Sequence, residues 1–315
     1  MLDTNREYSI QLHPSRCAIC GTEGNATTLY QGNFTSSSFN SLIFSARRLP
    51  DRIHYRMVKC KQCGLVRSDP VADPDTIGKL YADSEFNYEG EVAYLKKTYG
   101  KLLASLNSFG STKRSLLEIG CGNGFVLEEA LEQGYVSVSG IEPSKAAIEK
   151  ASTRVRPYLM QGVMRPGLFP VGEFDVICMF QVFDHISDPG TLLEECSRIL
   201  KPGGLVLTVN HNIDAIFARL LRERSPIVDI EHTYLYSPAT MRKMFTHYGF
   251  LVRKVEPIRN TYPLSYLSGL LPIQKRLKAF LVNGLQKSII GRIPVAFWLG
   301  NLMLVAQKPN EGTDQ

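Results

Sequence analysis

The chain has 315 residues, of which 44% are hydrophobic, and carries a formal net charge of +6. A chain of this length and composition can bury one large core and a smaller one, which excludes a disordered protein and favours two globular units. The N-terminus lacks a basic stretch followed by an apolar run, and no apolar segment is long enough to cross a bilayer, so we expect a cytoplasmic protein without a transmembrane segment.

Two Cys-x-x-Cys pairs stand in the first part of the chain. They are Cys17 with Cys20 and Cys60 with Cys63, and a glycine follows the second cysteine of each pair. A disulfide framework is disfavoured in a reducing cytosol, whereas four thiolates in two pairs give the tetrahedral environment of a structural zinc ion. We therefore predict a four-cysteine zinc-binding module over residues 1–70. Redox-active or merely buried thiols are the alternative.

Residues 71–112 are predicted to form a helical linker. Apolar residues recur in it at three- and four-residue steps, the pattern of amphipathic helices. The segment contains Tyr81, Tyr88 and Tyr94. Aromatic residues at helical spacing belong to a core more often than to a ligand site, so we favour the core for these tyrosines, and contact with a ligand is the alternative.

The strongest signal is the segment 116–124, which reads Leu-Leu-Glu-Ile-Gly-Cys-Gly-Asn-Gly. A short apolar strand enters three alternating glycines, and a helical pattern follows. A backbone that turns sharply after a parallel strand and lets a ligand lie against its amides has no room for Cβ atoms there. A dinucleotide fingerprint needs its third glycine at the position of Phe125. A plain strand-to-helix turn without a ligand is the alternative.

Further strand patterns follow in order along the chain. They cover 136–141, which leads into Glu142, then 157–161, 174–180, 205–210, 250–255 and 300–308. A carboxylate at the end of the second of these strands can accept both ribose hydroxyls of a cofactor. The alternation of strands and helices predicts a doubly wound parallel sheet.

A basic and apolar insertion lies at about 257–294, between the last two predicted strands. We expect it to cap the substrate site. A helix lying on a membrane surface and a dimer contact are the other interpretations, because apolar runs with Lys and Arg suit either.

Glu118, inside the strand, together with the Gly-x-Gly-x-Gly run resembles the first motif of class I methyltransferases that use S-adenosyl-L-methionine (SAM). The loop after the fourth strand and the Lys-Pro-Gly-Gly turn at 201–204 are similar to later segments of that family. The resemblance implies an α/β, Rossmann-like sheet of seven strands, the last antiparallel, in a SAM-binding domain over 113–315, with the linker as a lid. The residues assigned to the cofactor site are Glu118, Gly120, Cys121, Gly122, Asn123, Gly124, Glu142, Pro143, Val163, Met164, Phe180 and Gln181.

Methyl transfer from a sulfonium requires alignment of the nucleophile and, where that group carries a proton, a base. In a parallel α/β sheet, ligands bind outside the carboxyl ends of the strands. This places His185 and His232 on the reactive side, and we predict both as catalytic residues. His211 is a further candidate. A structural role, such as capping the following helix, is the alternative for His185.

The order of zinc module, linker, SAM domain and a Glu-His-Thr-Tyr segment at 231–234 resembles bacterial methyltransferases of deoxysugar and small-metabolite biosynthesis. It implies methyl transfer to a small-molecule acceptor, such as a nucleotide-linked sugar or a secondary metabolite, at carbon, oxygen or nitrogen. An RNA methyltransferase with an RNA-binding zinc module and a SAM-binding protein without catalysis are the alternatives. The sequence disfavours nucleic acid as a partner, because the chain lacks a dense basic run with interleaved aromatic residues. The oligomeric state is left open.

Overall fold

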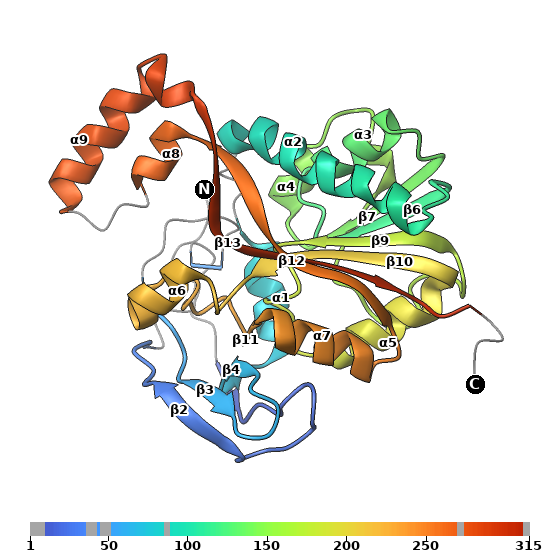
Figure 1. The fold of residues 1–315 in the computed structure, drawn as a ribbon, viewed down its shortest axis with the longest axis horizontal. Helices are drawn as coiled ribbons and strands as arrows, with labels where there is room; N and C mark the ends of the chain where they lie inside the picture. Colours follow the sequence, from blue (N-terminus) through green and yellow to red (C-terminus); the bar gives the residue numbers. More distant parts are fainter. Residues whose placement is uncertain (1–9, 36–42, 45–51, 85–88, 270–273, 311–315) are drawn as a thin grey trace.

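The computed structural model describes residues 10–35, 43–44, 52–84, 89–269 and 274–310 (Figure 1). Its strands are β1 (Leu12–His13), β2 (Ala26–Tyr30), β3 (Met57–Cys60), β4 (Val66–Ser68), β5 (Val71–Ala72), β6 (Ser115–Ile119), β7 (Ser137–Glu142), β8 (Leu159–Gln161), β9 (Phe174–Phe180), β10 (Leu200–His211), β11 (Tyr234–Leu235), β12 (Leu251–Pro263) and β13 (Pro294–Gln307). Its α-helices are α1 (Pro74–Ala82), α2 (Glu89–Ser105), α3 (Phe125–Glu132), α4 (Lys145–Glu149), α5 (Pro189–Ile199), α6 (Ile216–Leu221), α7 (Pro238–His247), α8 (Leu264–Gly269) and α9 (Lys275–Gln286).

A seven-stranded sheet forms the centre of the molecule, in the order β12-β13-β10-β9-β6-β7-β8. Neighbouring strands from β10 to β8 are parallel, and β13 is antiparallel to both β10 and β12. This confirms the predicted Rossmann-like sheet with its antiparallel last strand. The strand order reverses beside β6, where β9 and β7 lie on opposite sides of it, and ligands bind at such switch points.

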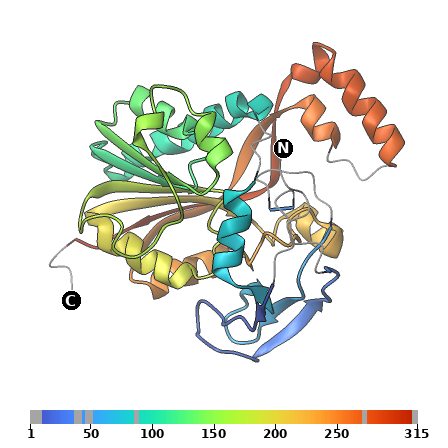
Figure 2. The ribbon, with the colours of Figure 1, turned by 180° about the vertical axis from the view of Figure 1, so that it is seen from behind.

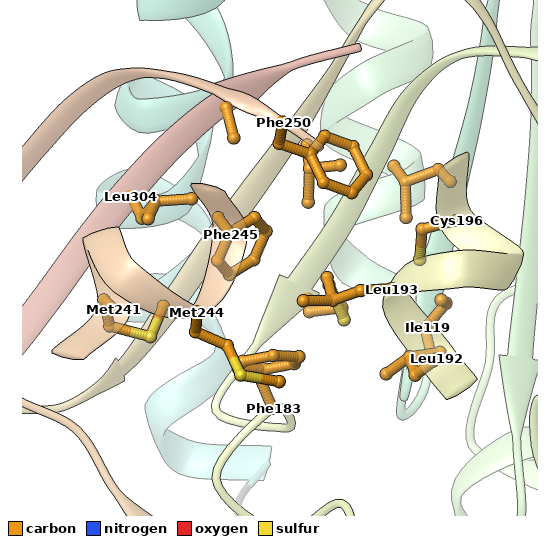
Figure 3. Packing of buried hydrophobic residues seen from close by; sticks show 14 of the residues in the cluster. Ile119, Phe183, Leu192, Leu193, Cys196, Met241, Met244, Phe245, Phe250 and Leu304 are labelled. Carbon is orange, nitrogen blue, oxygen red and sulfur yellow. The ribbon is translucent and has the colours of Figure 1, made fainter. Parts of the chain in front are cut away.

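Helices cover both faces of this sheet, with α2 and α3 on one face and α5 and α7 on the other (Figures 1 and 2). Because side chains alternate along a strand, Leu116 of β6 faces the first helix layer and Leu117 the second. Figure 3 shows the second layer, in which Phe245 of α7 packs beside Phe183 and Phe250.

The last two strands are longer than the sequence pattern predicts. β12 continues to Pro263 and β13 begins at Pro294, so the two form a ribbon that extends past the rest of the sheet (Figure 1). The insertion predicted over 257–294 is therefore shorter, with α8 and α9 between the ends of the ribbon. Residues 270–273 of the insertion lie outside the described part.

A small β-sheet at the N-terminal side lies beside the two cysteine pairs, of which Cys60 alone belongs to a strand. Its order is β11-β4-β3-β2, so a strand from residues 234–235 completes it. The buried Arg67 donates to the backbone carbonyl and the hydroxyl of Ser15. Residues 1–9, 36–42 and 45–51 of the predicted module lie outside the described part of the chain.

The helices of the linker occupy the predicted region as α1 and α2. Asp73 caps α1 by accepting from the backbone N–H of Thr76 at 2.8 Å, and Pro74 opens the helix. Among the described residues, no helix has the length and apolar character needed to span a membrane.

We expect Phe245→Ala to lower the free energy of unfolding by about 3–5 kcal/mol, because it removes a ring from a closely packed cluster and leaves a cavity. Urea denaturation measures the change. The matched control is Val136→Ala, at a side chain that is 81% exposed; it should change the free energy by less than about 0.5 kcal/mol. An equally small effect at Phe245 would contradict its packing.

Candidate cofactor and acceptor site

The glycine turn lies at the carboxyl ends of β6 and β7. Gly120 has φ +71° and donates its N–H to the carbonyl of Ile141 at 2.8 Å. A Cβ at Gly120 would overlap the side chain of Val182, and an L residue would be strained at this φ. Gly122 and Gly124 also have positive φ values. The shape of the turn therefore requires glycine, as the sequence predicted.

Glu142 ties this turn to the next strand. Its Oε2 accepts from the N–H of Gly122 at 2.8 Å, and its Oε1 accepts from the N–H of Ser144 at 2.9 Å. The sequence assigned this carboxylate to ribose hydroxyls. An ionised carboxylate has about four acceptor positions, so two remain for a ligand after these backbone bonds.

Three buried acceptor atoms in the described structure have no hydrogen-bond partner and flank the turn. They are Glu118 Oε2, Asn123 Oδ1 and Gln181 Oε1. Glu118 and Gln181 come from neighbouring strand ends, because Glu118 of β6 pairs with Cys178 of β9. A buried acceptor without a donor costs about 1–3 kcal/mol. A ligand with several N–H donors, such as the ammonium group of SAM, would satisfy such a set.

Gln181 also adopts an unusual backbone conformation, with φ +58° in a residue that is not glycine. Its N–H donates to the carbonyl of Val209 at 2.7 Å, which holds the conformation in place. Strained backbone of this kind is concentrated at ligand and active sites.

The remaining predicted cofactor residues lie in three places. Val163 and Met164 follow β8 beside the end of β7, since the N–H of Gly162 donates to the carbonyl of Glu142 at 3.0 Å. The ring of Phe180, by contrast, stacks on Tyr99 with 4.3 Å between the centroids and lies in the core. The sequence assigned Phe180 to cofactor contact, and this stays a prediction. Pro143 and Cys121 belong to the turn and its immediate surroundings.

A buried carboxylate, Asp184, lies at the centre of three histidines. Its Oδ2 accepts from His211 Nδ1 at 2.7 Å and lies 4.0 Å from His232 Nε2, while His185 Nε2 lies 3.7 Å from its Oδ1. The ring of His232 contacts those of His185 and His211, with centroids 4.7 and 4.6 Å apart. The structure thus brings together both predicted catalytic histidines and the further candidate.

The orientation of His232 follows from its hydrogen bond to a backbone carbonyl. Its Nδ1 lies 2.8 Å from the carbonyl oxygen of Ile227, which can only accept, so Nδ1 carries the hydrogen. The Nε2 of the neutral ring is then free of hydrogen and faces the cluster.

Tyr81 of the linker reaches the same cluster. Its hydroxyl lies 2.8 Å from His185 Nδ1, and its ring packs against the apolar cluster of Leu80 and Ile230, so Tyr81 has the predicted core packing as well as a contact with the histidines. Tyr94 donates its hydroxyl hydrogen to the carbonyl of Arg292, away from the cluster. Tyr88 lies outside the described residues.

The charges of the cluster shift two pKa values. Burial by itself would raise the pKa of Asp184, but the hydrogen bond from His211 and the charges that the three histidines can carry hold that pKa well below its usual range. Burial, and then the charges on His211 and His185, lower the pKa of His232 well below its usual value. At neutral pH an ionised Asp184 therefore faces a neutral His232.

The sequence placed residues 181–185 and 210–212 on the reactive side but did not single out Asp184 or Asn210 as site residues. For Asp184 the available signal was an acidic residue directly before a histidine in the loop after the fourth strand. Asn210 lies near the end of β10, and within the described residues neither polar atom of its buried amide has a hydrogen-bond partner.

The four cysteines of the N-terminal module converge as predicted. Their sulfur atoms all lie within 4.8 Å of one another, with Cys17 and Cys63 at 3.3 Å and Cys20 and Cys60 at 3.5 Å. Gly21 and Gly64 have φ +66° and +83°, and their amides donate to Cys17 and Cys60 carbonyls. Four thiols at these separations fit the tetrahedral donor set of zinc, in which sulfurs lie about 3.8 Å apart.

Asp184, His211 and His232 form a second group whose possible ligand atoms lie within 4.8 Å of one another. Two imidazoles and a carboxylate are ligands that several transition metals accept. A metal bound to Nε2 of His232 would prevent that atom from accepting a proton, so the two roles exclude each other.

A comparison with known proteins identifies the family of this chain. A family model described as "Methyltransferase domain" matches residues 92–255. The ubiquinone biosynthesis O-methyltransferase of Caulobacter vibrioides is 34% identical over 113 residues, which are 32% of this chain and 43% of the relative. That of Vibrio parahaemolyticus is 25% identical over 169 residues, 48% of this chain and 72% of the relative. The chain thus spans less than half of the length of the Caulobacter relative.

Among solved structures, the complex between the Haloferax volcanii Trm112 methyltransferase activator and a methyltransferase contains a chain that is similar to this one. It has 19% sequence identity to this chain and a TM-score of 0.49, and the match covers 70% of this chain and 95% of that one.

We expect the stability of Glu118→Gln, relative to the original protein, to rise with pH. Burial and then the charge of Glu142 raise the pKa of Glu118 well above its usual value. The unfolded chain therefore releases this proton near pH 4.3, while the folded chain retains it to higher pH, so the native carboxyl loses stability as pH rises from about 4.3 toward the raised pKa. Glutamine does not titrate.

The measurement is urea unfolding of cofactor-free protein at a series of pH values. Glu173→Gln, at an exposed carboxylate, is the control and should show no such trend. Parallel pH curves for Glu118→Gln and the original protein would contradict the raised pKa.

Proposed function

We propose, from the premise that this chain belongs to the methyltransferase domain family, that it transfers the methyl group of SAM to a hydroxyl oxygen of a small organic acceptor. The observation that carries this proposal is the position of two sets of polar groups at the carboxyl ends of one parallel sheet. Unpartnered acceptors surround the glycine turn, and a histidine cluster surrounds Asp184 beside it.

The glycine turn and its neighbours would bind the cofactor. Glu118, Asn123 and Gln181 offer acceptors to the ammonium group, and the free acceptor positions of Glu142 suit the ribose hydroxyls. The segment at Val163 and Met164 would border the adenine. When bound, SAM supplies an electrophilic methyl group, and the residues of this chain align the acceptor with it.

His232 would accept the proton of the acceptor hydroxyl at Nε2. Its Nδ1–H is held by Ile227, and its lowered pKa keeps Nε2 unprotonated at neutral pH. The imidazolium formed by proton transfer would face the ionised Asp184, which stabilises it. His185, bonded to Tyr81, would orient the acceptor at the edge of the cluster.

An oxygen acceptor is favoured by the relatives, which are named O-methyltransferases. This supports a hydroxyl group over the carbon acceptor of the sugar C-methyltransferases that the sequence resembles. A hydroxylated sugar or secondary metabolite fits the proposal.

The zinc module would position the catalytic segment. Ser68 of β4 donates its hydroxyl hydrogen to the carbonyl of His232 at 2.9 Å, and its N–H donates to the carbonyl of Thr233 at 2.8 Å. A zinc ion bound by the four cysteines would fix the sheet that holds Ser68. The module would thus act on the acceptor site through the backbone.

We expect His232→Ala to lower methyl transfer about 100-fold or more, while SAM affinity changes less than about threefold, since the base acts in the chemical step. Formation of S-adenosylhomocysteine with a panel of hydroxylated acceptors measures transfer, and calorimetry measures SAM binding. His247→Ala, at an exposed histidine of α7, is the matched control. Full activity of His232→Ala would refute the assigned base.

Because the pKa of His232 is lowered, the kcat of the original protein should persist as the pH falls through 6.5.

We expect about one zinc ion per chain, lost together with most of the activity in Cys17→Ser. Metal analysis by mass spectrometry and the transfer assay measure both effects. Cys196→Ser, at a buried thiol of α5 outside the group of four, should keep its zinc. A second metal ion that disappears in His232→Ala would place a metal on the histidine cluster and overturn the role of His232 as a base.

A further inference from the structure

We propose that the end of the molecule formed by α8, α9 and the adjoining part of β13 docks on the surface of an anionic lipid membrane. Residues 264–269 and 274–298, called here the docking surface, make up the described part of this end. It projects from the α/β body, on the same side as α6 in both views (Figures 1 and 2).

The charge of this segment is entirely of one sign. The chain has 30 Asp and Glu residues, but none lies between positions 257 and 310, and five Lys and Arg residues occur between positions 264 and 298. Lys287 and Arg292 are exposed. Each basic residue close to an anionic bilayer strengthens binding by about fivefold, so a segment without any opposing carboxylate has a large cumulative attraction.

The same segment exposes an unusual number of large apolar side chains. Seven of the nineteen such side chains in the described part of the chain lie between Leu277 and Trp298. Ile289 is 87% exposed and Phe280 is 76% exposed. Leu277 and Phe280 are three residues apart in α9, so they share one helix face. Exposed apolar groups next to basic groups are the combination that helices at a membrane interface require.

An aromatic side chain extends this surface along the ribbon. Trp298, the only tryptophan of the chain, is 52% exposed, and the guanidinium of Arg259 lies 3.7 Å from its ring centroid. Phe297 lies beside Phe217 of α6, with centroids 5.9 Å apart. Tryptophan and arginine are suited to the boundary between lipid headgroups and acyl chains, because each has an apolar body and a polar end.

The charge distribution favours lipid over a second copy of the chain. A symmetric dimer through this surface would bring two acid-free basic segments together, and the repulsion would oppose association. An anionic lipid surface provides the opposite charge and accepts apolar side chains at the same time. The proposal does not depend on the identity of the methyl acceptor.

The test is sedimentation of the full chain with vesicles of phosphatidylcholine alone and with phosphatidylglycerol added. We expect binding to the anionic vesicles only, weakened by salt. Phe280→Ser with Ile289→Ser should reduce the partition coefficient about tenfold or more, whereas Val136→Ser with Val171→Ser, at exposed apolar residues outside the docking surface, should leave it unchanged. Lys287→Glu with Arg292→Glu should also reduce it, and the control Arg253→Glu should not.

Three results would overturn the proposal. The first is an absence of binding to anionic vesicles, and the second is equal binding by the docking-surface variants and their controls. The third is a concentration-dependent dimer in light scattering that Phe280→Ser with Ile289→Ser dissolves, which would assign the surface to a second copy. Urea unfolding of each variant establishes that it is folded.

Discussion

The burial of polar groups at one edge of the central sheet is the constraint on which the site depends. Glu118, Gln181 and Asp184 are all withdrawn from water, and they follow or belong to the adjacent strands β6 and β9. In a parallel sheet the carboxyl ends of the strands meet at one edge, so these groups are concentrated there by topology. Three imidazoles compensate Asp184 within the protein. Within the described residues, the buried oxygens of Glu118, Asn123 and Gln181 near the glycine turn have no hydrogen-bond donor. This difference divides the edge into a half for the cofactor and a half for the methyl acceptor.

The N-terminal sheet and the α/β fold are joined by strand pairing, a common apolar cluster and hydrogen bonds, so they are not two separate units. β11 follows His232 in the chain but pairs with β4 of the cysteine-containing sheet. Cys17 and Cys60 lie in the same apolar cluster as Ile119 of β6. The backbone amides of Thr233 and Tyr234 also donate to the carbonyl of Asp184, at 2.9 and 3.1 Å. One short segment thus joins the small sheet, the acceptor site and the large core.

The sequence was most informative where a feature depends on local residues. The glycine turn, the two cysteine pairs and the alternation of strands and helices need only neighbouring positions, and the structure contains each of them. Contacts that depend on tertiary pairing were missed. Tyr81 and His185 are 104 residues apart, and nothing in either segment alone indicates their hydrogen bond. The packing of Phe180 against Tyr99 was not foreseen either, because position at a strand end does not reveal which way a ring turns. The length of the β12–β13 ribbon follows from mutual pairing of residues that individually resemble an irregular insertion.

The β12–β13 ribbon connects the docking surface with the acceptor site. Asn301 of β13 pairs with His211 of β10, and Trp298 is three residues earlier in the same strand, a span of about 10 Å. Between them, Gly300 has φ +95° and its carbonyl accepts from the N–H of Asn212 at 2.7 Å. The positive φ of Gly300 thus changes the direction of the strand between the docking surface and the acceptor site, and the hydrogen bond to Asn212 holds the inner part of the strand next to His211.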